Sequence, residues 1–278
     1  MSYSRRRSRP RRGNAGARDV ALGLTLSALG ISIIAALLFA WWYVSSNSET
    51  LGADNCPTRG PKAVHAILID RSDPVTPLQQ QQILQDIQRS IRAARAGERF
   101  DLFVAEGDAV NTLAPSVSLC SPGRGADASS LYQNPEMIQR AFDERFVRIL
   151  EAELRKLLEP SSRQNSPILE SIKAAAVASF GSVEAATPKR LIIISDMIQH
   201  SALNSHYRGE TDFDELSRRT QWRALQANLT SVEVTVFYLL RPNARRPGGR
   251  PLQDRGHQLF WERAVRASGG QLMELRTL

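Results

Sequence analysis

The sequence predicts an α/β fold class. We expect a three-layer α/β/α sandwich whose sheet is mostly parallel with one antiparallel strand, preceded by one N-terminal transmembrane helix. Three observations support this. Residues 20–44 are 25 positions without a charged side chain. The apolar runs AVHAILID (63–70) and RLIIISD (190–196) are typical of strands buried on both faces, as in a parallel sheet. Segments with helical spacing of apolar residues separate most of the strands, as parallel crossovers require.

The uncharged segment 20–44 is long enough to cross a bilayer. A helix of this length, at ~1.5 Å per residue, spans a hydrocarbon core of ~30 Å with some tilt. The segment also exceeds the ~7–15 apolar residues of a cleaved signal peptide, so we expect an uncleaved anchor. A buried core helix is the alternative, and such helices are shorter. Trp41, Trp42 and Tyr43 stand at one end, where amphipathic rings favour the headgroup region.

The formal charge of +8 belongs mainly to the tail before this anchor. Residues 1–44 hold seven arginines and one acid, and subtracting them from the chain's 36 bases and 28 acids leaves 29 and 27. Basic residues beside a span favour the cytoplasm. We therefore expect a cytoplasmic tail over 1–19, a single pass through the inner membrane, and a periplasmic or extracellular C-terminal domain. A cytoplasm-facing adaptor whose arginine tail binds nucleic acid is an alternative, although we expect no specific nucleic-acid partner.

Residues 45–62, rich in Ser, Asn, Gly and Pro, indicate a tether before a domain over 63–278. The connection between the second and third strands is too short for a crossover helix, so these strands should be antiparallel. Asn134 as cap and Pro135 in the first turn begin the long helix, and Pro160 ends it. The predicted elements are strand 63–70, helix 77–96, strands 100–106 and 115–121, helices 134–159 and 166–180, strand 190–196, helix 212–228, strand 232–240, helix 254–268 and strand 271–278.

The two cysteines, Cys56 and Cys120, suit an exported domain. They are too few for a disulfide-dense scaffold or a four-thiolate metal site. Cys56 precedes the first strand, and the antiparallel third strand returns Cys120 to the same edge of the sheet. We therefore predict a disulfide between them. Two unrelated buried thiols are the alternative.

Acidic residues end two of the predicted strands. Asp70 ends the first strand in Asp70-Arg71-Ser72-Asp73-Pro74, and Asp196 ends the central one in Ser195-Asp196-Met197. Ligands of open α/β sheets bind at the carboxyl ends of the strands. An Asp-x-Ser after the first strand and a second Asp after the fourth resemble a von Willebrand factor A domain, a Rossmann-like fold, over about residues 63–278.

This resemblance implies a metal-ion-dependent adhesion site. In such a site, hydroxyl and carboxylate oxygens bind a hard cation, usually Mg²⁺, and a carboxylate of the partner protein completes the shell. Here Pro74 replaces the second serine of the pattern and cannot be a ligand, so the site is incomplete. A vestigial site, in which Asp70 only stabilises a turn, is the alternative. The implied ligands are Asp70, Ser72, Asp73, Ser166 in place of a threonine, and Asp196.

Motifs for catalysis are missing from the sequence. The strand ending at Asp70 is similar to that of haloacid dehalogenase-type phosphatases, but position 72 is serine where they need an acid. The chain has no Gly-x-Ser-x-Gly elbow, phosphate-binding glycine loop or HEXXH motif. A divergent envelope hydrolase with a site near Asp70, Asp196 and His200 is the second hypothesis.

The first hypothesis is a non-enzymatic interaction or scaffold protein of an envelope-associated assembly. It has an unidentified protein partner, no small-molecule substrate and, apart from Mg²⁺, no cofactor. If the metal site is vestigial, we expect binding to move to the loops over 122–133 and 242–252. The second loop is basic and favours an acidic partner, and a solvated linker is the alternative for it. Its candidate partner-binding residues are Arg241, Arg245, Arg246 and Arg250.

Overall fold

The computed structural model describes residues 15–47, 52, 56–72, 74–105, 114–129, 133–159 and 165–278. The chain divides into two compact units, Met1–Thr50 and Leu51–Leu278. The first unit contains helix α1 (Ala15–Asn47), and its segment Val20–Tyr43 is long and apolar enough to cross a membrane, with a mean hydropathy of 2.3. Most arginines of the predicted tail lie before position 15, outside the described residues.

The second unit contains a six-stranded sheet in the order β3-β2-β1-β4-β5-β6. Adjacent strands are parallel except β2 and β3, which are antiparallel. This confirms the predicted sheet and its single antiparallel strand. The strands are β1 (Ala63–Asp70), β2 (Glu98–Ala105), β3 (Val117–Cys120), β4 (Lys189–Ser195), β5 (Val232–Tyr238) and β6 (Gln271–Thr277).

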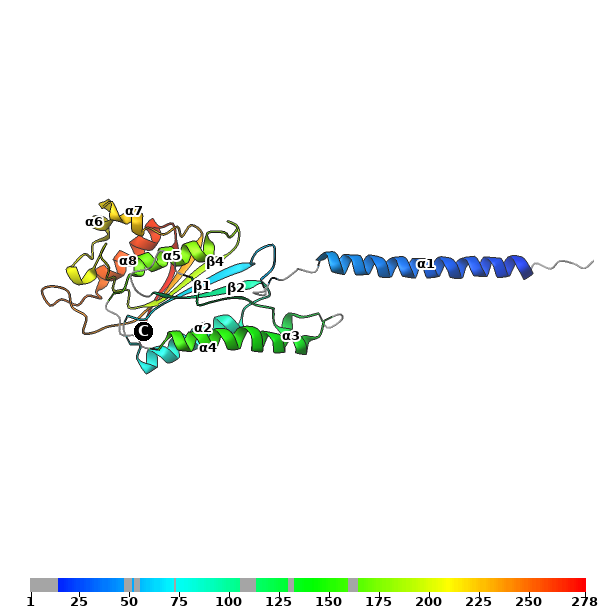
Figure 1. Cartoon of the computed structure of the whole chain (residues 1–278), viewed down its shortest axis with the longest axis horizontal. Coiled ribbons are helices and arrows are strands. Elements are labelled where there is room, and N and C mark those ends of the chain that lie inside the picture. The colour runs from blue at the N-terminus through cyan, green and yellow to red at the C-terminus, as the bar shows by residue number, and fades with distance from the viewer. Residues whose placement is uncertain are drawn as a thin grey trace, which may run out of the picture. The chain divides into compact units, whose positions relative to one another are not determined.

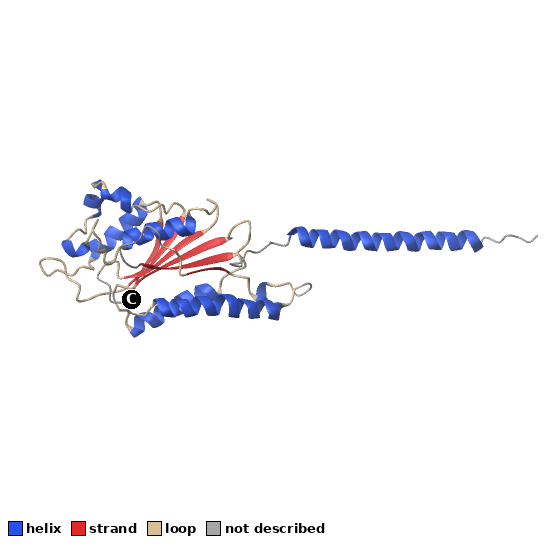
Figure 2. Cartoon of the chain, viewed as in Figure 1, coloured by secondary structure: helices blue, strands red, loops and turns tan. Residues whose placement is uncertain are grey.

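Helices cover both faces of the sheet (Figures 1 and 2). One face packs against α5 and α8, with the short helices α6 and α7 beside them, and the other packs against α2 and α4. The three-layer prediction is therefore confirmed. The helices are α2 (Pro77–Arg92), α3 (Pro135–Phe142), α4 (Arg148–Leu157), α5 (Ile168–Phe180), α6 (Phe213–Arg218), α7 (Gln221–Leu225) and α8 (Arg255–Ala267).

Alternate residues of β1 enter two separate cores. Leu68 packs in the core under α5 and α8, whereas Ile67 and Ile69 pack in the core under α2 and α4. Successive side chains of a strand point to opposite faces, so both sets must be apolar when helices cover both faces. This explains why the interior of the strand is apolar apart from His65, whose ring Nε2 lies 3.2 Å from a carboxylate oxygen of Glu98.

Two predicted helices differ from the observed ones. The helix expected over 134–159 contains a π-helical turn, Asp143–Val147, between α3 and α4. The helix expected over 212–228 is divided into α6 and α7, because Arg219 adopts an extended backbone with φ −77° and ψ 147°. Residues on both sides of the break, Leu216 and Trp222, are nevertheless buried in the same core.

The predicted disulfide between Cys56 and Cys120 is confirmed, with the two Cα atoms 4.8 Å apart. Cys120 is the last residue of β3 and pairs with Arg99 near the start of β2. The bond therefore fastens the segment before β1 to the edge of the sheet where the parallel strands begin. Asp70, at the end of β1, lies at the opposite edge.

Candidate functional site: a polar edge at the ends of β1 and β4

Asp70 is held by three hydrogen bonds at the end of β1. Its Oδ1 accepts from the Ser72 backbone N–H at 2.9 Å. Its Oδ2 accepts from the hydroxyls of Ser166 at 2.9 Å and Ser195 at 2.8 Å. Only 6% of Asp70 is exposed. Buried charge is tolerated when donors surround it, and the three donors around Asp70 meet that need.

The strand register explains why Ser195 reaches Asp70. Ile69 of β1 lies beside Ile194 of β4 in a parallel pair, so the next residues, Asp70 and Ser195, are level with each other. Ser166 comes from a different segment, just before α5, where its backbone pairs with that of His200 after β4. The structure thus brings the predicted Ser166 to Asp70 and adds Ser195, which was not predicted.

Asp196 is paired with a cation of its own chain. It is 2% exposed, its Oδ1 accepts from the Ile198 backbone N–H at 2.8 Å, and its Oδ2 lies 3.4 Å from Nε of Arg241. Arg241 follows β5, the next strand of the sheet. Gln253 supports the pair by donating to the backbone oxygens of Asp196 and Leu239, both at 2.8 Å.

These residues do not fit a cation site as they stand. Both oxygens of Asp70 already accept hydrogen bonds, and Arg241 brings a positive charge to Asp196. Mg²⁺ requires near-octahedral oxygen ligands, and like charges repel it. The described residues include no group of three or more His, Cys, Asp or Glu side chains that could hold a metal ion. Asp73, one of the predicted ligands, lies outside the described residues.

The predicted basic loop is partly neutralised. Arg246 Nη2 pairs with Asp254 Oδ2 at 2.5 Å, and Arg245 donates to the backbone oxygen of Pro242. The loop also closes on itself, because the backbone N–H of Arg246 donates to the oxygen of Arg250 at 3.0 Å. The segment is therefore hydrogen-bonded rather than a loose linker, and Arg245 and Arg250 are both exposed in it.

His200 is placed at this edge but points to other partners. Its ring Nδ1 lies 2.8 Å from the hydroxyl of Ser205, and its ring packs edge-on against Tyr207. Ser166 and His200 meet through their backbones, by bonds of 2.8 and 3.0 Å. The geometry thus gives His200 a role in fixing the loop after β4.

A buried chain of polar side chains lies behind the edge. Nδ1 of His206 lies 3.0 Å from Nε2 of His257, whose Nδ1 lies 2.6 Å from the hydroxyl of Tyr238. Burial lowers the pKa of His257 to about 4, and burial followed by the charge of His257 lowers the pKa of His206 well below its usual value. Both rings are therefore neutral at pH 7. Burial also raises the pKa of Tyr238.

Comparisons with known proteins complete the description of this domain. No protein-family profile matches the chain, and no curated protein matches its sequence. A conserved hypothetical protein, BatB from Bacteroides thetaiotaomicron, is 12% identical, with a TM-score of 0.38 over 78% of this chain and 91% of that one. An aerotolerance-related membrane protein from Bacteroides fragilis, carrying multiple mutations to serines, is 12% identical, with a TM-score of 0.37 over 77% and 90%. These values carry no functional argument.

Proposed function

We propose that the chain is a single-pass membrane protein whose von Willebrand A-like domain, outside the cytoplasm, binds a protein partner without catalysing a reaction. The observation that carries the proposal is that groups of the chain itself already bind both strand-end carboxylates. Asp70 is bonded to two serines and Asp196 is paired with Arg241. General acid–base or nucleophilic catalysis needs such groups to reach a substrate.

The rim of the same edge has the composition of an interaction surface. Tyr207 is 42% exposed and Leu203 39% exposed in the loop after β4, and Leu240 is 41% exposed after β5. Arg250 is exposed in the loop before α8. Tyrosine and arginine are enriched among residues that dominate binding energy, and exposed apolar side chains beside them supply the contact area.

The inner-membrane location and the orientation rest on three features. The segment Val20–Tyr43 has the length and hydropathy of a span. Arginines dominate the sequence before it, which favours a cytoplasmic N-terminus. A disulfide joins the only two cysteines of the chain, and such bonds persist in oxidising compartments.

We further propose that partner binding at this edge needs no Mg²⁺. Arg241 already supplies the positive charge that a cation would bring to Asp196. The hydrolase alternative predicts turnover of generic phosphate or ester substrates by the purified chain. The nucleic-acid alternative predicts a domain that faces the cytoplasm.

The experiment is capture of a partner from native membranes with the tagged full-length chain. Tyr207→Ser and Arg250→Glu replace exposed side chains of the rim and should each reduce capture at least tenfold at an unchanged melting temperature. Arg223→Glu, an exposed arginine on α7, is the matched control and should capture normally. Normal capture by both rim variants would show that this edge is not the binding surface. Turnover of a phosphate or ester substrate would contradict the proposal and favour the hydrolase hypothesis.

A further inference from the structure

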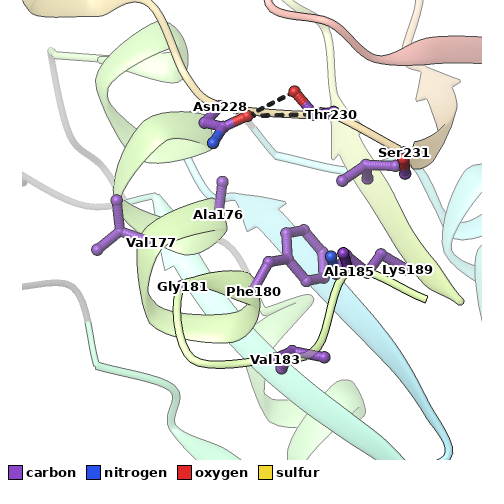
Figure 3. A pocket seen from close by; sticks show the side chains of 11 residues that line it. Ala176, Val177, Phe180, Gly181, Val183, Ala185, Lys189, Asn228, Thr230 and Ser231 are labelled. Atoms are coloured by element: carbon purple, nitrogen blue, oxygen red, sulfur yellow. Dashed lines mark hydrogen bonds between the residues drawn. The ribbon is translucent and has the colours of Figure 1, made fainter. Parts of the chain in front are cut away.

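A second site lies at the opposite edge of the sheet, where β4 and β5 begin (Figure 3). It is a cavity of about 370 Å³ between the end of α5, the loop that follows it, and the turn before β5. This volume falls within the range of small-ligand pockets. The cavity shares no residue with the polar edge, so it goes beyond the function proposed above.

The cavity has one apolar wall and one polar wall. The apolar wall comes from the last turns of α5 and the loop after it, and Phe180 is its largest member. The polar wall comes from the first residue of β4 and the turn before β5, and it contains no carboxylate. The apolar residues are Ala176, Val177, Phe180, Val183 and Ala185, and the polar ones are Lys189, Asn228, Thr230 and Ser231.

Lys189 is a buried cation without a partner of its own among the described residues. It is 9% exposed, and Figure 3 shows its side chain pointing toward Phe180. The next residue, Arg190, points to the other side and pairs with Glu233 at 2.9 Å, which leaves Lys189 on the α5 side. Among the described residues that line the cavity, Lys189 is the only charged one. Its ammonium therefore favours an anion in the cavity.

The turn before β5 directs a second donor into the same space. Oδ1 of Asn228 accepts from the backbone N–H of Thr230 at 3.2 Å and from its hydroxyl at 2.8 Å. These two bonds fix which end of the amide is oxygen, so its NH₂ group faces the cavity on the side of Ala176 (Figure 3). Ser231, with a φ of 61°, adds a hydroxyl from a left-handed backbone that is rare outside glycine.

We infer that this cavity binds a carboxylate carried on a short aliphatic stem. The ammonium of Lys189 pairs with the carboxylate, Asn228 and Ser231 supply further polar groups on the same wall, and the wall around Phe180 covers the stem. A free medium-chain acid and the apolar C-terminal residue of a polypeptide share this chemistry.

The test measures binding to the full-length chain in detergent micelles by calorimetry. The probes are octanoate, N-acetyl-leucine and the neutral N-acetyl-leucinamide. At least one acid should bind ten times more tightly than the amide and should protect Lys189 from an amine-reactive reagent, read by mass spectrometry. Tighter binding of octanoate identifies a free acid as the source, and tighter binding of N-acetyl-leucine identifies a chain terminus.

Two variants test the assignment of the donors. Lys189→Met should weaken acid binding at least tenfold, whereas Lys156→Met, an exposed lysine on α4, should bind normally. Asn228→Asp keeps the acceptor for Thr230, so it should fold normally, and its charge should abolish binding. Any of three results overturns the inference. The first is that neither acid binds at concentrations up to 10 mM, and the second is that neither acid binds ten times more tightly than the amide. The third is that Asn228→Asp binds the acid as tightly as the unaltered chain.

Discussion

Removal of the Cys56–Cys120 disulfide should cost the second unit about 4 kcal/mol of unfolding free energy. The bond joins residues separated by 64 positions. In the loop-entropy model, a cross-link that closes a loop of this length removes about 14 cal/mol/K from the unfolded chain, which is ~4 kcal/mol at 25 °C. At roughly 2–4 °C per kcal/mol for a domain of this size, the melting temperature should fall by about 8–16 °C.

The assay is urea denaturation of Leu51–Leu278 with alanine at both cysteine positions. Alanine leaves no unpaired thiol or hydroxyl in a site where Cys120 is fully buried. The unaltered unit, kept reduced by a thiol reductant throughout, should lose a similar free energy and serves as the control. If the double variant unfolds within about 1 kcal/mol of the oxidised unit, the bond does not constrain the unfolded chain and the estimate is refuted.

The remaining predictions concern a carboxylate, a histidine and the orientation. Asp70→Ala should destabilise the second unit by about 2–4 kcal/mol in urea, because it leaves two buried hydroxyls without an acceptor; unchanged stability would contradict the network. The pKa of His257 is lowered from 6.5 to about 4 in the folded chain. Between these two pH values the unfolded chain therefore binds more protons than the folded chain. Stability should therefore fall as the pH falls, by about 2 kcal/mol between pH 7.5 and 5. His257→Gln should lose that part of the pH dependence, and an identical dependence in the variant would rule the histidine out. Alkaline phosphatase fused after Leu278 should be active, whereas a bright cytoplasmic reporter there would reverse the orientation.

The strand positions could be predicted from the sequence because a strand that is buried on both faces is a short run of apolar residues. The second half of β1 is apolar at successive positions, because Leu68 enters one core and Ile67 and Ile69 enter the other. The disulfide followed from topology, because one antiparallel strand returns Cys120 to the edge where the domain begins. Helix interruptions left no such signal. Arg219 separates two short helices, and within each one the buried residues, Phe213 and Leu216 or Trp222 and Leu225, have helical spacing.

The candidate site could be predicted only in part. An acid at the end of an apolar strand indicates the carboxyl edge, and Asp70 and Asp196 are found there. Their partners depend on which strands are neighbours. Ser195 meets Asp70 because β4 lies beside β1, and Arg241 meets Asp196 because β5 lies beside β4. The sequence alone suggested a metal-ligand role for Asp196 and a surface role for Arg241, whereas the fold pairs their charges.

Site-specific photo-crosslinking in native membranes tests the proposed interaction edge most directly. A photoreactive residue is placed at Leu203 on the rim, or at Arg223 on α7 as the control, and adducts are identified by mass spectrometry with and without a chelator. We expect one protein partner to be captured from position 203 and not from 223, with equal yield in the chelator. Equal capture from both positions, or loss in the chelator that Mg²⁺ restores, would contradict a cation-independent partner surface at the ends of β1 and β4.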